Sequence, residues 1–228
     1  ADAEPEDLTA QLDLPPDNDY EAARHLSSQH KRFGAYNNQR WPKGCHPEYP
    51  GIHAVKVFVE WNTFPSQNMR EVTDSDLQEI VDAKVWGWTL EQLRAAWGGQ
   101  PMAKVAFYLA CEAYRRLGCL HVEINDGVDG SEHQIHIKAK PIPGGVIGVG
   151  WFPNGTCGDH VNQHIDTIKF TLTGLARLFA HELGHNHGEQ HQFSGQDRHR
   201  SVMSYNPPRR FYGFLKGDEG ILPRDRSR

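Results

Sequence analysis

The chain has 228 residues, a length that fits one large domain or one domain with a modest extension. Its 24 basic and 29 acidic residues leave a net charge of −5, which argues against a protein that binds nucleic acid. No apolar run approaches the roughly 18 residues that a membrane helix requires, so we expect no membrane association. Histidine is unusually frequent, with 14 residues, and this frequency directs attention to metal binding.

The first fifty residues are polar and rich in proline. We interpret residues 1–51 as an N-terminal extension and residues 52–228 as the main domain. A short helix at 18–32 is expected within the extension. The chain starts without methionine and without an apolar signal core, which fits a trimmed secreted protein and fits a truncated chain equally well.

The four cysteines show no CxxC spacing, which argues against a cysteine zinc knuckle. They are Cys45, Cys111, Cys119 and Cys157. Four cysteines can form two disulfides in three ways, and the alternative is that some remain buried thiols. An even number without metal spacing is typical of an oxidising compartment, so we expect a secreted protein.

After residue 51, some segments have the hydrophobic periodicity of a strand and others that of a helix. Alternating valines predict a strand at 55–59. Thr73 predicts the start of a helix, because Asp76 follows three residues later, and Pro101 suits the first turn of a longer helix. A short helix is expected between them, at 89–97. Four further strands are predicted at 121–124, 134–139, 146–152 and 164–170. This order predicts an α+β domain with a mixed sheet.

The last predicted helix, 171–187, separates an apolar face from a face with two histidines. At about 100° per residue, His181 and His185 lie opposite the apolar stripe. They are one turn apart and can share a metal ion, and we expect them to face an open cleft. His187 falls on the apolar side, so we do not count it as a ligand.

The two histidines belong to an H-E-x-x-H pattern at residues 181–185. In this pattern the imidazoles bind zinc, and the glutamate, here Glu182, takes a proton from water and passes it to the leaving amine. Gly188 can adopt a positive φ and end the helix. His191 can then turn back as a third ligand, which completes H-E-x-x-H-x-x-G-x-x-H.

A methionine follows this pattern in the sequence Ser201-Val202-Met203-Ser204-Tyr205. Together the two motifs resemble those of the metzincin zinc endopeptidases, which are named for a methionine turn below the metal. Ser-x-Met-x-Tyr resembles the serralysin and astacin branches, whereas the order of upstream elements resembles the matrixins. The resemblance covers 52–212 as a pattern and is close only over 179–205. It implies a metzincin-like α+β domain with a twisted, mixed five-stranded sheet, an antiparallel edge strand, a long helix, a zinc-binding helix and a Met-turn.

The resemblance also implies a role for each site residue. Three histidines would bind the catalytic zinc: His181, His185 and His191. Glu182 would be the general base, Met203 a hydrophobic floor, and Tyr205 a zinc ligand at rest or a donor to the oxyanion. The implied protein is a secreted, monomeric endopeptidase that cleaves internal peptide bonds. Its polypeptide substrate would lie extended along the edge strand 146–152.

Two alternatives to this function remain open. A catalytically inactive, zinc-containing binding protein would keep the same ligands, although the intact Glu182 favours catalysis. A zincin with a distant glutamate as third ligand would have to use Glu219.

Cys45 has two possible roles. Its thiolate would block the zinc as a latency switch, or its sulfur would form a disulfide.

Three further groups of polar residues have a possible functional role and a simpler structural explanation. Calcium would bind, or a plain turn would form, at Asp126, Asp129 and Glu132. Arg209 and Arg210 would either favour an acidic substrate side chain or be solvated. A second zinc would need ligands from four histidines near the strands: His133, His136, His160 and His164.

Overall fold

A computed structural model describes residues 41–51, 53–83, 88–115, 119–124, 133–188 and Met203. Several expectations lie outside the described residues: the helix at 18–32, the calcium turn at 126–132, His191, Tyr205, Arg209, Arg210 and Glu219.

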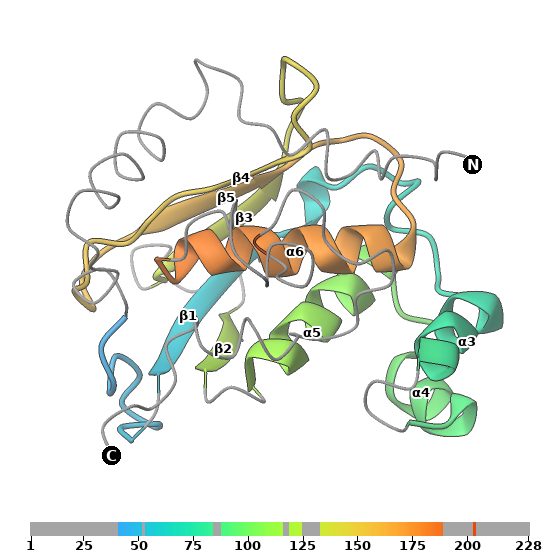
Figure 1. Cartoon of the computed structure of the whole chain (residues 1–228), viewed down its shortest axis with the longest axis horizontal. Helices are drawn as coiled ribbons and strands as arrows, with labels where there is room; N and C mark the ends of the chain where they lie inside the picture. Colours follow the sequence, from blue (N-terminus) through green and yellow to red (C-terminus); the bar gives the residue numbers. More distant parts are fainter. Residues whose placement is uncertain are drawn as a thin grey trace, which may run out of the picture.

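A five-stranded sheet organises the described part of the chain, with the strand order β2-β1-β3-β5-β4. The strands are β1 (His53–Glu60), β2 (Cys119–Ile124), β3 (Ile135–Ala139), β4 (Gly148–Gly150) and β5 (Val161–Ile165). Neighbouring strands are parallel except for β4, which runs antiparallel to β5 at one edge of the sheet. The expected α+β class with an antiparallel edge strand is therefore what the structure shows (Figure 1).

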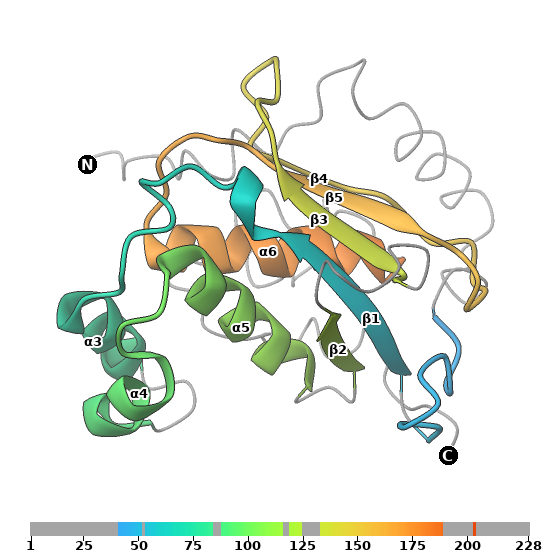
Figure 2. The ribbon, with the colours of Figure 1, turned by 180° about the vertical axis from the view of Figure 1, so that it is seen from behind.

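Four α-helices accompany the sheet in the described part of the chain, and a 3-10 turn (Trp61–Thr63) follows β1. They are α3 (Asp74–Ala83), α4 (Leu90–Trp97), α5 (Met102–Arg115) and α6 (Leu172–Asn186). The helices α5 and α6 lie against the same face of the sheet, and α3 and α4 form a pair to one side (Figures 1 and 2).

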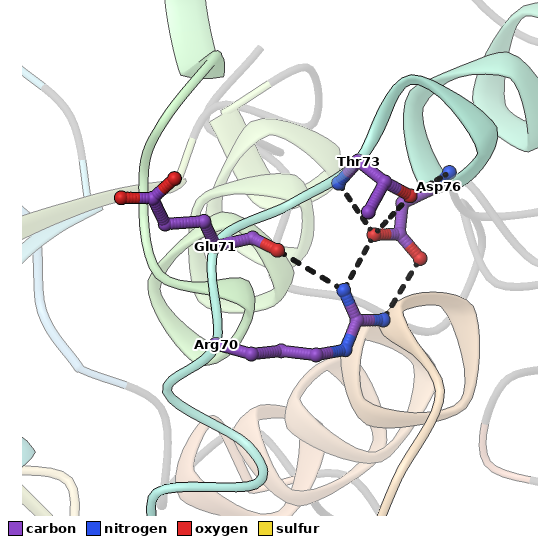
Figure 3. Close-up of polar contacts among 4 residues, drawn as sticks. All are labelled: Arg70, Glu71, Thr73 and Asp76. Atoms are coloured by element: carbon purple, nitrogen blue, oxygen red, sulfur yellow. Dashed lines mark hydrogen bonds and ion pairs between the residues drawn. The ribbon is translucent and has the colours of Figure 1, made fainter.

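Threonine caps begin three of the four described α-helices, and the sequence predicts the one at Thr73. At α3, the Asp76 N–H donates to the Thr73 hydroxyl (3.2 Å), and the Thr73 N–H donates to the Asp76 carboxylate (2.7 Å). Arg70 adds two hydrogen bonds to the same carboxylate, at 2.7 and 2.9 Å, and one to the Glu71 carbonyl (Figure 3). The hydrogen bonds from Arg70 lower the pKa of Asp76. A reciprocal Thr89 and Gln92 box caps α4 in the same way.

Aromatic rings fill the space between the helices and the sheet. The Phe179 ring on α6 lies 5.6 Å from Phe107 on α5 and 6.1 Å from Phe64, centroid to centroid. Trp41 is fully buried and belongs to the same core, although it precedes β1 by twelve residues. The apolar face of α6 thus packs into the centre of the molecule, which places its other face beside β4.

Two strands differ from their predicted positions. The ladder of β4 covers only Gly148–Gly150 rather than 146–152. The strand predicted at 164–170 is wrong, because β5 spans Val161–Ile165 instead. The inward position 163 of β5 carries a glutamine that is fully buried, so the strand lacks the apolar alternation that would reveal it.

One disulfide joins Cys45 to Cys157. The latency role considered for the Cys45 thiolate therefore does not apply to this oxidised form. Cys111 and Cys119 do not form the second disulfide that the even number of cysteines suggested. None of the described helices is both long enough and apolar enough to span a membrane.

Candidate active site

The helix α6 carries the predicted site and has a defined start and end. The Thr171 hydroxyl accepts a hydrogen bond from the Gly174 N–H (3.1 Å) and caps the first turn. At the other end, Gly188 has φ 86°, the left-handed conformation predicted for it. The helix therefore ends at Asn186, five residues before His191, which lies outside the described residues.

His181, Glu182 and His185 lie together on one side of α6. The two imidazole rings are 4.9 Å apart between centroids and nearly perpendicular, at 84°. Relative exposures are 4% for each histidine and 0% for Glu182. The structure thus brings two of the three predicted ligands and the predicted base into one buried group.

The expected open cleft at this face is wrong for the described structure, because β4 lies directly on the helix. A Cβ atom added at Gly148 would come within 2.6 Å of Glu182 Oε1. One added at Gly150 would lie 2.9 Å from His185 Cβ and 2.5 Å from the Glu182 carbonyl oxygen. Only glycine allows the edge strand to approach the helix this closely.

Met203 lies on the other side of α6, against Gly184. A Cβ at Gly184 would overlap the Met203 sulfur and would lie 3.2 Å from the Tyr114 hydroxyl. That hydroxyl donates to the Ala180 carbonyl oxygen at 2.7 Å. Met203 is 1% exposed, so the side chain predicted as a hydrophobic floor is buried under the last turn of the helix.

His187 points to the core rather than toward the two histidines. Its ring stacks on Tyr114, with centroids 5.2 Å apart, and its Nε2 shares a 2.7 Å hydrogen bond with His121 Nε2. Burial lowers the pKa of His121 to about 3, so this imidazole is neutral near pH 7. This position agrees with the exclusion of His187 from the predicted ligand set.

Asn186 and Trp41 are two site residues that the sequence analysis missed. The Asn186 side-chain amide donates to the carbonyl oxygens of Trp151 (3.0 Å) and Asn162 (3.1 Å). The main-chain carbonyl oxygen of Asn186 accepts a hydrogen bond from the Trp41 indole N–H at 2.8 Å. No sequence pattern marks these contacts, because the partners lie up to 145 positions apart.

The histidines on the outer side of the sheet form a separate cluster. His136 Nε2 donates to Glu60 Oε1 at 2.8 Å, and the His133 ring lies 5.1 Å from His136 and 5.8 Å from His160, centroid to centroid. The His164 ring lies edge-on to Trp151, 4.8 Å away between centroids. Within the described ranges, no three histidine, cysteine, aspartate or glutamate side chains are arranged to hold a metal ion.

The donor set on α6 fits zinc. Two imidazoles one helical turn apart supply neutral nitrogen ligands, and a neighbouring carboxylate is the base that zinc hydrolases use. The third nitrogen ligand predicted for a tetrahedral site, His191, lies outside the described residues.

Among the solved structures that overlap with this chain, two are of myroilysin. No family model matches the chain, and no curated protein does. One solved structure of myroilysin overlaps with a TM-score of 0.44 at 12% identity, over 83% of this chain and 98% of that chain. A second one gives 0.44 at 11% identity, over 81% and 84%. Similarity at this level carries no weight for the function, which we therefore base on the residues of this chain.

Proposed function

We propose that the chain is a zinc-dependent endopeptidase that hydrolyses internal peptide bonds. The observation that carries the proposal is the placement of Glu182 between His181 and His185 on one buried helix face, directly against the glycines of the sheet's edge strand. Met203 below Gly184 is the second feature of the metzincin resemblance that supports it.

Each site residue has a distinct task in this proposal. His181, His185 and His191 hold the zinc, which when bound polarises a carbonyl group and makes water more acidic. The Glu182 carboxylate takes the proton from water and then delivers it to the nitrogen of the leaving amine. Tyr205 would donate its hydroxyl proton to the developing oxyanion.

The substrate would bind as an extended chain along residues 146–152. β4 forms one edge of the sheet, where an added strand can form main-chain hydrogen bonds. Because Gly148 and Gly150 contact Glu182 and His185, a peptide paired with β4 would pass close to the catalytic group. The pairing would select extended polypeptides rather than small esters or amides.

The disulfide Cys45–Cys157 supports a secreted location, since disulfides persist in oxidising compartments. We also propose that the protein acts as a monomer. A calcium ion would bind at Asp126, Asp129 and Glu132.

Substitution of the general base tests the mechanism. Glu182→Gln keeps the size of the side chain but removes the proton acceptor, so cleavage of casein should fall by several orders of magnitude while zinc content stays stoichiometric. Glu79→Gln, at an exposed position on α3, is the matched control and should keep full activity. Zinc content is measured by atomic absorption and cleavage by release of peptides.

The outcome separates the enzyme from the inactive binding protein. Undiminished cleavage by Glu182→Gln would reject the mechanism. If the zinc-loaded wild type cleaves no member of a broad peptide library but retains peptides on the protein, the binding protein is the better description.

A further inference from the structure

Asn186 occupies the last position of α6, one residue after the predicted ligand His185. It is fully buried. The two hydrogens of its amide go to two different strands, to the Trp151 carbonyl just beyond β4 and to the Asn162 carbonyl in β5. The Asn162 carbonyl also accepts the Trp151 N–H at 3.0 Å. The three groups therefore form one closed network that joins the helix to both strands.

The Asn186 main chain is held as firmly as its side chain. Its carbonyl oxygen accepts the indole N–H of Trp41, a fully buried residue. The amide oxygen Oδ1 is buried without a hydrogen-bond partner, so the amide owes its orientation to its two donor contacts. The Asn186 side-chain amide therefore donates two hydrogen bonds in a fixed orientation, to the carbonyl oxygens of Trp151 and Asn162.

This network lies where the spacing between helix and edge strand matters most. Gly148 and Gly150 present no side chains toward Glu182, so the backbone of β4 lies directly against the helix at this point. At the end of the strand, the Phe152 ring meets His185 edge-on at 5.3 Å between centroids. The Asn186 hydrogen bond to Trp151 is adjacent to this contact and fixes the end of β4 over the ligand-bearing turn.

We propose that Asn186 is a positioning residue, which holds the edge strand in register with Glu182 and His185. This inference rests on the proposed peptidase function, because the strand is the expected binding site of the substrate. Without the amide, the Trp151 and Asn162 carbonyl oxygens each lose the hydrogen bond from Asn186, and the end of β4 is held less firmly against the helix. The loss of Asn186 should therefore reduce the cleavage of long peptides, which pair with the strand, more than the cleavage of short ones.

The experiment compares Asn186→Leu, similar in shape but without donors, with Asn162→Leu as the matched control. The control residue has an exposed side chain and contributes to the network only through its main-chain carbonyl. Cleavage of a ten-residue substrate and of a four-residue substrate is measured, together with zinc content and hydrogen exchange at the Trp151 amide. Asn186→Asp, which replaces the donor by an oxygen, serves if the leucine variant does not fold.

For Asn186→Leu we expect kcat/KM to fall at least tenfold for the long substrate, mostly through KM, and less than threefold for the short one. Exchange at Trp151 should accelerate at least tenfold with zinc content unchanged, and Asn162→Leu should match the wild type. Wild-type exchange at Trp151 in both Asn186 variants, or equal losses on both substrates, would overturn the role of Asn186. A wild type that cleaves neither substrate would instead reject the peptidase function itself.

Discussion

Gly184 allows α6 to lie directly on two buried side chains. Its missing Cβ leaves room for the Met203 sulfur and the Tyr114 hydroxyl, between the turns that carry His181 and His185. In a helix interior, alanine normally stabilises relative to glycine by about 0.5–1 kcal/mol. The contact with Met203 should reverse this order.

Gly184→Ala should lower the free energy of unfolding by about 1–3 kcal/mol, because a methyl group would overlap the methionine sulfur. Urea denaturation measures the change. The double variant Gly184→Ala/Met203→Ala should lose less than the sum of the two single variants, because the shorter side chain makes room. Strict additivity would show that the two residues do not meet.

His121 should make the fold sensitive to acid. Its pKa is about 3 in the folded protein, because the ring is buried, and 6.5 when unperturbed. Below pH 6.5 the unfolded chain binds a proton that the folded chain does not. The free energy of unfolding should therefore fall between pH 6.5 and pH 3, by at most about 1.4 kcal/mol per pH unit.

His121→Gln removes this titration and keeps a polar group facing His187. Its stability, measured by urea denaturation at several pH values, should depend less steeply on pH than that of the wild type. Parallel pH profiles for the two proteins would show that His121 does not carry the effect.

At the scale of elements, the sequence predicted where helices start, because the signals for a helix start are local. It did not predict the bounds of a strand that carries a buried polar residue. Thr73 caps α3 as its spacing to Asp76 predicted, and the helices expected from residues 89 and 171 begin there with threonine caps. β5 escaped recognition because Gln163 occupies an inward position. The histidine-bearing face of α6 was identified from the helical period, but its burial under β4 depends on a contact between distant segments.

The contact between β4 and α6 can be tested at Gly150. Gly150→Ala should reduce the free energy of unfolding by about 1–3 kcal/mol, since the added methyl meets the Glu182 carbonyl and His185 Cβ. Gly158→Ala is the control, because a Cβ there has no heavy atom within 4 Å. Equal stabilities of the two variants would mean that the strand moves away at no cost.

For the whole molecule, the sequence indicated the fold class but not the long-range links. The strand order β2-β1-β3-β5-β4 and the choice of Cys157 as the partner of Cys45 depend on how distant segments pack. The ligands His181 and His185 were found because one helix carries both. Trp41 and Asn186 were missed because their contact spans 145 positions and leaves no periodic trace.

Removal of the disulfide should destabilise the whole molecule. Cys45 and Cys157 are separated by 112 positions, and a cross-link over so long a loop restricts the unfolded chain strongly. Cys45→Ser/Cys157→Ser should lose about 2–5 kcal/mol in urea denaturation. Dithiothreitol should destabilise the wild type to a similar extent and leave the double variant unchanged, whereas a wild type indifferent to reduction would contradict the prediction.

The stretch 47–51 is exposed, and it lies between Cys45 and the first strand. A protease that nicked the backbone there would leave the upstream piece attached through the sulfur bridge to Cys157. Electrophoresis without a reducing agent would then show one band of unchanged mass. Only a reduced sample would reveal the cut, so proteolysis of this protein is best followed on paired reduced and unreduced gels.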